Sequence, residues 1–165
     1  MSYINAGGAL LGMVFLFTSG CGGGSGNFIP GTKVTRTRKN ESIIQRCEEY
    51  RAAVERKDAK KLVLMASPEY WEDGGTTDGS DDYGFRELRE VLTSQFQRAN
   101  KIRYSIRYMK IRSEGRRAYV DVIVDASYTI PDAQGGESRL DKRDQNQLVL
   151  DWNEKKEQWM FRSGY

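Results

Sequence analysis

The residues of this sequence that could do chemistry are carboxylates and tyrosines, because the 165-residue chain contains no histidine. The usual His-Asp dyads and most zinc sites are therefore excluded. A carboxylate beside a tyrosine remains possible, since a desolvated carboxylate with a raised pKa can act as a base. Asp73 with Tyr104 is the candidate catalytic pair. Serine nucleophile elbows, phosphate loops and paired cysteine motifs are missing, and we expect no cofactor.

The acidic loop over residues 72–84 is the other segment whose residue types could do chemistry. Asp78, Ser80 and Asp82 alternate in a glycine-rich stretch, as oxygen ligands of calcium would. The spacing lacks the central glycine and the closing glutamate of an EF-hand loop. We therefore interpret the segment as a solvated loop and predict no metal site.

Aromatic residues with polar atoms could line a binding pocket. Such side chains suit a site that buries a small apolar ligand and fixes one or two of its polar groups. Ordinary core and rim packing is the alternative, and it is the commoner role of aromatic side chains. The candidate pocket residues are Tyr70, Trp71, Tyr104, Tyr108, Tyr128, Trp152 and Trp159.

The N-terminal segment has the pattern of an export signal. Residues 4–17 form a short, uncharged apolar run that ends just before Ser19, Gly20 and Cys21. Such a run suits a signal-peptide core better than a spanning helix, which needs about 20 residues. The segment resembles a bacterial lipoprotein signal, which implies that residues 1–20 are removed and that Cys21 carries a lipid.

The alternative is that residues 1–20 stay attached as an N-terminal anchor. Both alternatives place the rest of the chain in the cell envelope, held at a membrane and facing the periplasm, with the outer membrane favoured over the inner one. The glycine-rich residues 22–26 and the basic stretch that follows predict a flexible tether over 21–39, close to an anionic bilayer.

The net charge of +3 comes from this tether. Four basic residues precede position 40: Lys33, Arg36, Arg38 and Lys39. From Asn40 onward, 22 basic side chains stand against 23 acidic ones. The positive charge therefore does not indicate a nucleic-acid partner.

Helical periodicity dominates the first half of the remaining chain, residues 40–165. Asn40 is expected to cap a helix that ends near residue 57, with Cys47 on its apolar stripe as a buried, inert thiol. Asp58 is expected to cap a shorter second helix, and Asp81 or Asp82 a third that ends around residues 98–100.

Strand periodicity dominates the second half. Alternation with a period of two predicts strands over 101–111, 118–130, 145–152 and 158–165. A phase change at Met109 indicates a bulge in the first of these strands. Residues 131–144 are interpreted as a polar connection. Three helices followed by about four long antiparallel strands predict an α+β domain whose helices pack on one face of a strongly curved sheet.

The order of these elements resembles the nuclear transport factor 2-like superfamily, which includes the SnoaL-like cyclases. The segments that carry the resemblance are Tyr50 with Val54, Ser67-Pro68, Tyr70-Trp71, Gly84-Phe85 and Trp159-Met160-Phe161-Arg162. The resemblance covers residues 40–165 and implies a cone-shaped fold with a pocket at its open end, often in a homodimer. It does not imply one chemistry, because its members include enzymes, binding modules and secretion components.

We therefore expect a membrane-tethered envelope lipoprotein whose domain is a non-catalytic binding or assembly module. Tyr119, Ile123 and Tyr165 are expected on the exposed face of the sheet, where they would contact a second copy or another envelope protein. One alternative is a cyclase-like or isomerase-like enzyme that uses a pocket Asp and Tyr. Another is a secretion-system component.

Overall fold

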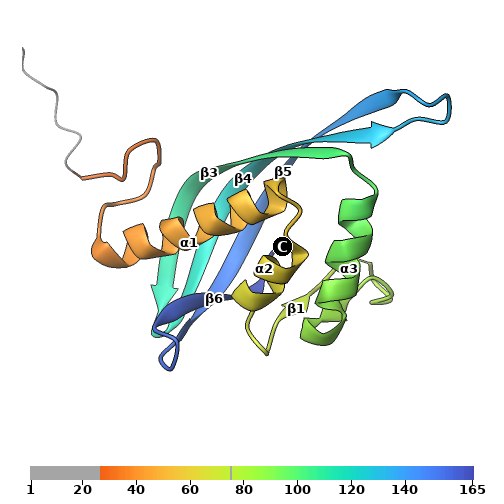
Figure 1. Ribbon diagram of the computed structural model, residues 1–165. Helices are drawn as coiled ribbons and strands as arrows, with labels where there is room; N and C mark the ends of the chain where they lie inside the picture. The colour runs from red at the N-terminus through yellow and green to blue at the C-terminus, as the bar shows by residue number, and fades with distance from the viewer. Residues whose placement is uncertain (1–26, 75) are drawn as a thin grey trace, which may run out of the picture.

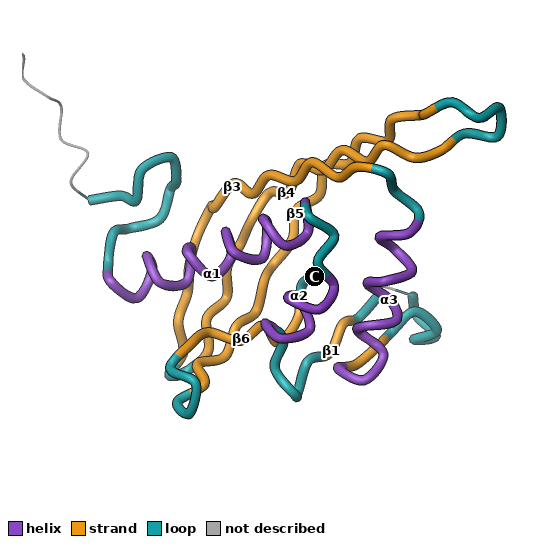
Figure 2. Tube along the Cα trace, in the orientation of Figure 1, coloured by secondary structure: helices purple, strands orange, loops and turns teal. Residues whose placement is uncertain are grey.

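The computed structural model describes residues 27–74 and 76–165, which form an α+β domain (Figures 1 and 2). The helices of this described part are α1 (Arg38–Glu55), α2 (Ala59–Met65) and α3 (Phe85–Gln97). Two short strands, β1 (Trp71–Glu72) and β2 (Tyr83–Gly84), pair on either side of the acidic loop. The main sheet consists of β3 (Lys101–Glu114), β4 (Arg117–Pro131), β5 (Glu137–Asn153) and β6 (Gln158–Ser163).

Helix α1 begins earlier than expected. Thr37 is its N-cap, and the Thr37 hydroxyl oxygen accepts a hydrogen bond from the Asn40 backbone N–H at 3.1 Å. Asn40, the expected cap, donates from Nδ2 to the Thr35 carbonyl at 2.9 Å instead. Ile43 and Cys47 lie on the buried stripe of the helix, as its periodicity predicts.

The segment before α1 packs on the domain, so the expected tether is wrong over its last part. Val34 is only 3% exposed and belongs to the core. Phe28 and Thr35 form an isolated antiparallel bridge, and the Lys33 N–H donates to the Tyr108 carbonyl at 3.3 Å. The folded domain therefore begins before residue 40, whereas residues 21–26 lie outside the described residues.

Helix α2 starts where the sequence predicts, and α3 starts later. The Asp58 carboxylate accepts a hydrogen bond from the first turn of α2 at 2.9 Å. Helix α3 begins at Phe85 after an N-cap at Gly84, because Asp81 and Asp82 accept hydrogen bonds from the acidic loop instead. None of the helices in the described part of the chain is long and apolar enough to cross a membrane.

The main sheet is antiparallel, with strand order β3-β4-β5-β6. A register shift between Tyr108 and Lys110 confirms the predicted bulge at Met109. The polar connection expected over 131–144 is wrong, because β5 already begins at Glu137 and pairs with the last part of β4. The backbone hydrogen bonds to β4 hold this polar segment in the extended conformation.

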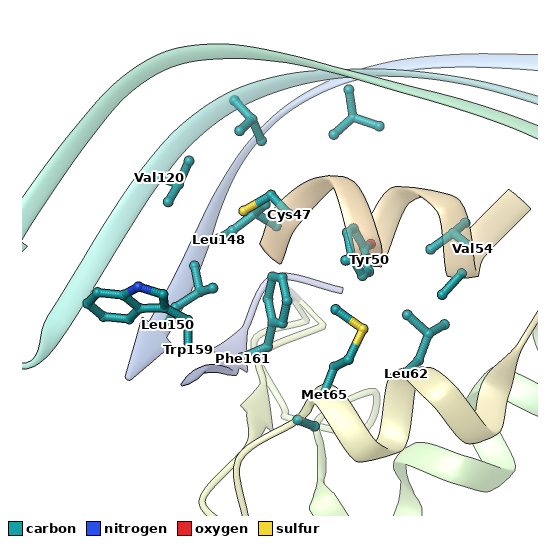
Figure 3. Close-up of a cluster of buried hydrophobic side chains, with 14 of the residues drawn as sticks. Cys47, Tyr50, Val54, Leu62, Met65, Val120, Leu148, Leu150, Trp159 and Phe161 are labelled. Atoms are coloured by element: carbon teal, nitrogen blue, oxygen red, sulfur yellow. The ribbon is translucent and has the colours of Figure 1, made fainter. Parts of the chain in front are cut away.

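The core lies between the helices and the inner face of the curved sheet (Figure 1). Figure 3 shows Cys47 and Tyr50 of α1 directed toward the same interior as Phe161 of β6 and Met65 of α2. Phe161 is fully buried. Burial of one sheet face beneath amphipathic helices stabilises a single domain of this size. This arrangement confirms the predicted fold class.

Candidate functional site

A cavity of about 220 Å³ opens between the sheet and the helices α1 and α3. Its apolar part comes from all of these elements, and its polar part comes from tyrosines, from β5 and from Gln95 of α3. The lining residues are Tyr50, Val54, Leu92, Gln95, Phe96, Ile102, Tyr104, Val124, Ala126, Tyr128, Lys142, Asp144, Asn146 and Tyr165. Such a combination of apolar wall and hydrogen-bonding groups suits a small molecule.

Two tyrosine hydroxyl groups meet in the wall of this cavity. The hydroxyl oxygens of Tyr50 and Tyr104 are 3.3 Å apart, and the two rings meet edge to face with centroids 5.9 Å apart. Tyr165 stacks on Tyr50 with a centroid distance of 5.0 Å. The Tyr165 hydroxyl donates to the Leu62 carbonyl at 2.8 Å, which fixes this ring in the wall.

Burial keeps these hydroxyl groups protonated. Desolvation raises the pKa of Tyr104 to about 12, although the hydrogen bond with Tyr50 acts in the opposite direction. Burial likewise raises the pKa of Tyr50, and the neighbouring Tyr104 adds to this shift. At neutral pH the cavity therefore offers neutral O–H groups, which can donate a hydrogen bond to a ligand or accept one from it.

Polar residues of β5 form the other side of the cavity. Lys142, Asp144 and Asn146 lie opposite buried residues of β4 in the antiparallel ladder. Because opposite residues share a face of the sheet, these three side chains belong to the inner face. The sequence analysis missed them because it placed residues 131–144 in a connection. Leu148 and Leu150 alternate with a period of two, and the same period extended toward the N-terminus reaches Asn146, Asp144 and Lys142. This extension is the sequence signal that could have identified the three residues.

The seven predicted pocket aromatics do not gather in one place. Tyr104 and Tyr128 line the cavity. Tyr70 and Tyr108 are buried in the core, where their hydroxyl groups donate to glutamates of β1 and α1 at 2.7 and 2.8 Å. Trp71 is 56% exposed on the short hairpin. Tyr70 and Tyr108 are therefore core residues and Trp71 is a surface residue, and none of the three lines the cavity.

The remaining two predicted aromatics lie near the N-terminal end of α1, away from the cavity. Trp152 and Trp159 line a separate hollow of about 410 Å³ together with Arg38, Lys39 and Arg116. The two indole rings meet with centroids 5.4 Å apart. Cation-π contact places the Lys39 ammonium 5.5 Å from the Trp159 ring centroid.

The Asp73–Tyr104 pair is not assembled in the cavity. Asp73 is exposed in the loop after β1 and is absent from the cavity lining. Asp144 is the carboxylate that shares the cavity with Tyr104. In the acidic loop, Asp78 accepts a hydrogen bond from the Ser80 N–H at 3.1 Å. No group of three or more potential metal ligands occurs among residues 27–74 and 76–165.

The expected contact residues lie on both sides of the sheet. Tyr119 and Ile123 alternate with the buried residues of β4 and therefore belong to the outer face. Tyr165 was expected on the exposed face, and this placement is wrong. The backbone of Gly164 has φ +98°, and the chain turns there so that the Tyr165 ring enters the cavity wall. Cys21, the residue expected to carry a lipid, lies outside the described residues.

Cys47 is the other cysteine of the chain. It is fully buried, and desolvation raises the pKa of its thiol well above the ordinary value. The thiolate is therefore strongly disfavoured, and Cys47 serves as an apolar core residue.

No protein-family model matches the sequence, and no curated protein matches it. Solved structures share its fold. A conserved protein from Planctomyces limnophilus is 14% identical over 78% of this chain and 94% of its own, with a TM-score of 0.65. A proposed dehydratase of the nuclear transport factor 2-like family from Streptomyces avermitilis is 14% identical over 76% of this chain and 92% of its own, with a TM-score of 0.59.

A third structure is a proposed scytalone dehydratase from Novosphingobium aromaticivorans. It is 12% identical over 76% of this chain and 80% of its own, with a TM-score of 0.60. Identities this low show the fold and not the activity. The described part of the chain is therefore a domain with the nuclear transport factor 2-like fold.

Proposed function

We propose that this protein is a membrane-tethered lipoprotein of the cell envelope whose domain binds a small, largely apolar molecule without transforming it. The observation that carries the binding role is the cavity in which the hydroxyl groups of Tyr50 and Tyr104 lie 3.3 Å apart. The tether is the lipid on Cys21, an expectation that rests on the leader sequence.

The size and polarity of the cavity support a ligand with a ring system and one polar group. An apolar cavity of about 150 Å³ accepts benzene, and this one measures about 220 Å³. Leu92, Phe96 and Ile102 supply apolar wall, whereas Tyr104 supplies a neutral hydroxyl group. A hydroxyl or carbonyl group on the ligand can therefore be satisfied inside the cavity.

Catalysis by a cavity carboxylate is the second candidate function. Asp144 shares the cavity with Tyr104 and Tyr128, and two of the structural neighbours are named as dehydratases. Asp144 is exposed, however, and it lacks the burial that poises a carboxylate as a base. Binding without chemistry is therefore the better supported function.

The exposed outer face of the sheet supports a further role in assembly. We place the contact with another envelope protein on Tyr119 and Ile123, two apolar residues of that face. A component of a secretion system is one such partner. This contact is separate from the cavity, so ligand and protein partner can be tested independently.

Naphthol and naphthalene are matched probes for the cavity, because they differ by one hydroxyl group. We expect the full-length protein to bind naphthol about fivefold more tightly, the value of one hydrogen bond. The variant Tyr104→Phe should remove this advantage and leave naphthalene binding nearly unchanged. Isothermal titration calorimetry measures both affinities.

A second pair of variants tests whether the probes occupy this cavity. Ala126→Leu fills part of it from β4 and should weaken both probes, whereas Ser127→Leu places the same side chain on the outer face and should weaken neither. Failure of both probes to bind, or equal effects of the two leucine variants, would show that the cavity is not the binding site.

A further inference from the structure

The first part of β5 has one unpaired edge. Strand β4 pairs with β5 from Glu137 to Asp151, but β6 pairs only with residues 149–153. In the described part of the chain, no other backbone hydrogen bond reaches the β5 segment 137–145. Strand β6 ends at Ser163, which lies opposite Val149, so β6 does not extend along this segment. The free N–H and C=O groups of such an edge can pair with another strand.

We propose that two copies of this chain associate through these edges, as antiparallel β5 strands related by a twofold axis at Leu140. In this register, residues whose numbers sum to 280 lie opposite one another. The main sheets of the two copies then continue into a single sheet, with the inner faces on the same side. A second copy is the partner because the order of charges along this strand complements itself.

The charges on the outer face of β5 carry this inference. Glu137, Arg139, Asp141 and Arg143 alternate in sign along one face of the strand. In the proposed register, Glu137 lies opposite Arg143 of the partner subunit, and Arg139 lies opposite Asp141 of the partner subunit. Within one copy, Arg139 already pairs with Asp141 at 2.8 Å and Arg143 with Asp125 at 3.1 Å, on the exposed outer face. The twofold axis repeats both interchain pairs, so each of the four charges also meets an opposite charge of the partner subunit.

Neighbouring registers do not have this property. If the pairing shifts so that Asp141 lies opposite Asp141 of the partner subunit, Arg139 lies opposite Arg143 of the partner subunit. If the shift runs the other way, Arg139 lies opposite Arg139 of the partner subunit, and Asp141 lies opposite Glu137 of the partner subunit. Like charges directly opposite one another are destabilising. The charges therefore select one register.

The inner face supplies an apolar contact at the same axis. Leu140 is 48% exposed, and it is one of the exposed large apolar residues of the described domain. In the proposed register, it lies against Leu140 of the partner subunit. Charged residues usually protect a sheet edge from pairing. Here the alternation of signs favours pairing with an identical strand, and the leucines lose exposed apolar surface when they meet.

Disulfide cross-linking in the full-length protein tests this arrangement. Directly opposite residues of antiparallel strands have Cα atoms about 4.5 to 5.5 Å apart, within the range of a disulfide. We expect Leu140→Cys to form a disulfide-linked dimer under mild oxidation, with the linked peptides mapped by mass spectrometry. Leu64→Cys is the matched control, because Leu64 is similarly exposed at 59% but lies on α2.

A charge swap tests the register. Arg139→Glu places two pairs of like charges across the interface and should reduce the dimer formed by Leu140→Cys about tenfold. The double change Arg139→Glu with Asp141→Arg restores both pairs and should restore cross-linking. The proposal fails if Leu140→Cys gives no more dimer than Leu64→Cys, if the double change does not restore it, or if Ile123→Cys cross-links instead through the outer face.

Discussion

Tyrosines provide the polar groups of the buried wall of the cavity, in a chain that has no histidine. The hydroxyl groups of Tyr50 and Tyr104 lie inside the apolar wall, and a residue type that is neutral at pH 7 can be placed there without an ion partner. The cavity is therefore suited to hold a neutral molecule and does not need to shift a proton to do so.

At the residue scale, we predict that stability falls between pH 10 and pH 12. Burial raises the pKa of Tyr104 from 10.0 to about 12, so the unfolded state loses this proton first as the pH rises. The stability contributed by the neutral hydroxyl is fully present below pH 10 and is lost as the pH approaches 12. Urea unfolding at several pH values, with tyrosinate absorbance in parallel, measures both events.

The variant Tyr104→Phe provides the control, because it removes one of the groups that titrate. Its stability should fall less steeply over the same range. Burial also raises the pKa values of Tyr70, Tyr108 and Tyr165 above the ordinary range, so these groups should ionise only as the domain unfolds. Titration of all tyrosines near pH 10 in a protein that stays folded would contradict this account.

At the scale of elements, the short strand β1 holds the end of the sheet in place. The Glu72 Oε2 atom accepts hydrogen bonds from the Tyr70 hydroxyl at 2.7 Å, from the Gly164 N–H at 2.7 Å and from the Tyr165 N–H at 3.3 Å. One carboxylate thereby connects the hairpin, the core and the residue that closes the cavity wall. Hydrogen bonds to a charged group are stronger than those between neutral groups.

We predict that Glu72→Ala lowers the free energy of unfolding by about 2 to 3 kcal/mol, because it leaves several donors without their acceptor. It should also weaken naphthol binding, because Tyr165 loses its backbone anchor. Glu69→Ala is the matched control: Glu69 forms an exposed ion pair with Arg162, and such pairs contribute less than about 1 kcal/mol. Urea unfolding compares the variants, and equal losses would contradict the anchoring role.

The helices and strands differ in how well the sequence predicts them. Helices α1 and α2 and the strands β3 and β4 were predictable from the spacing of their apolar residues, which in β3 changes phase once, at the Met109 bulge. The first half of β5 was not, because residues 137–144 are charged or polar on both faces except for Leu140. Only the pairing with β4 makes this segment a strand, so tertiary structure overrides local preference there.

The candidate site was less predictable than the fold, for the same reason. Tyr104 and Tyr128 were found from their residue type and alternation, but Lys142 and Asp144 depended on the register of β5. The alternation that begins with Trp159 and Phe161 places Tyr165 on the inner face, so the expectation of an exposed Tyr165 did not follow from the period of the strand. Registers and turns arise from contacts that are distant in sequence.

At the scale of the whole molecule, the variant Cys21→Ala tests whether a lipid anchors the protein in the cell envelope. We predict that this variant moves the protein from the detergent-extractable membrane fraction to the soluble periplasmic fraction, or leaves an unprocessed precursor, because the proposed site of lipid attachment is lost. Cys47→Ala is the matched control and should leave membrane fractionation unchanged, since Cys47 is buried in the core. Unchanged processing and membrane retention of Cys21→Ala would contradict lipidation.

The contact between α1 and β6 determines when the core can close during synthesis of the chain. Arg46 of α1 donates from Nε to the Trp159 carbonyl at 2.8 Å, and fully buried Phe161 belongs to the same strand. A chain emerging from the ribosome therefore lacks a closed interior until β6 has been synthesised. For the proposed location in the cell envelope, such a late closure would keep the nascent polypeptide unfolded until it has crossed the membrane.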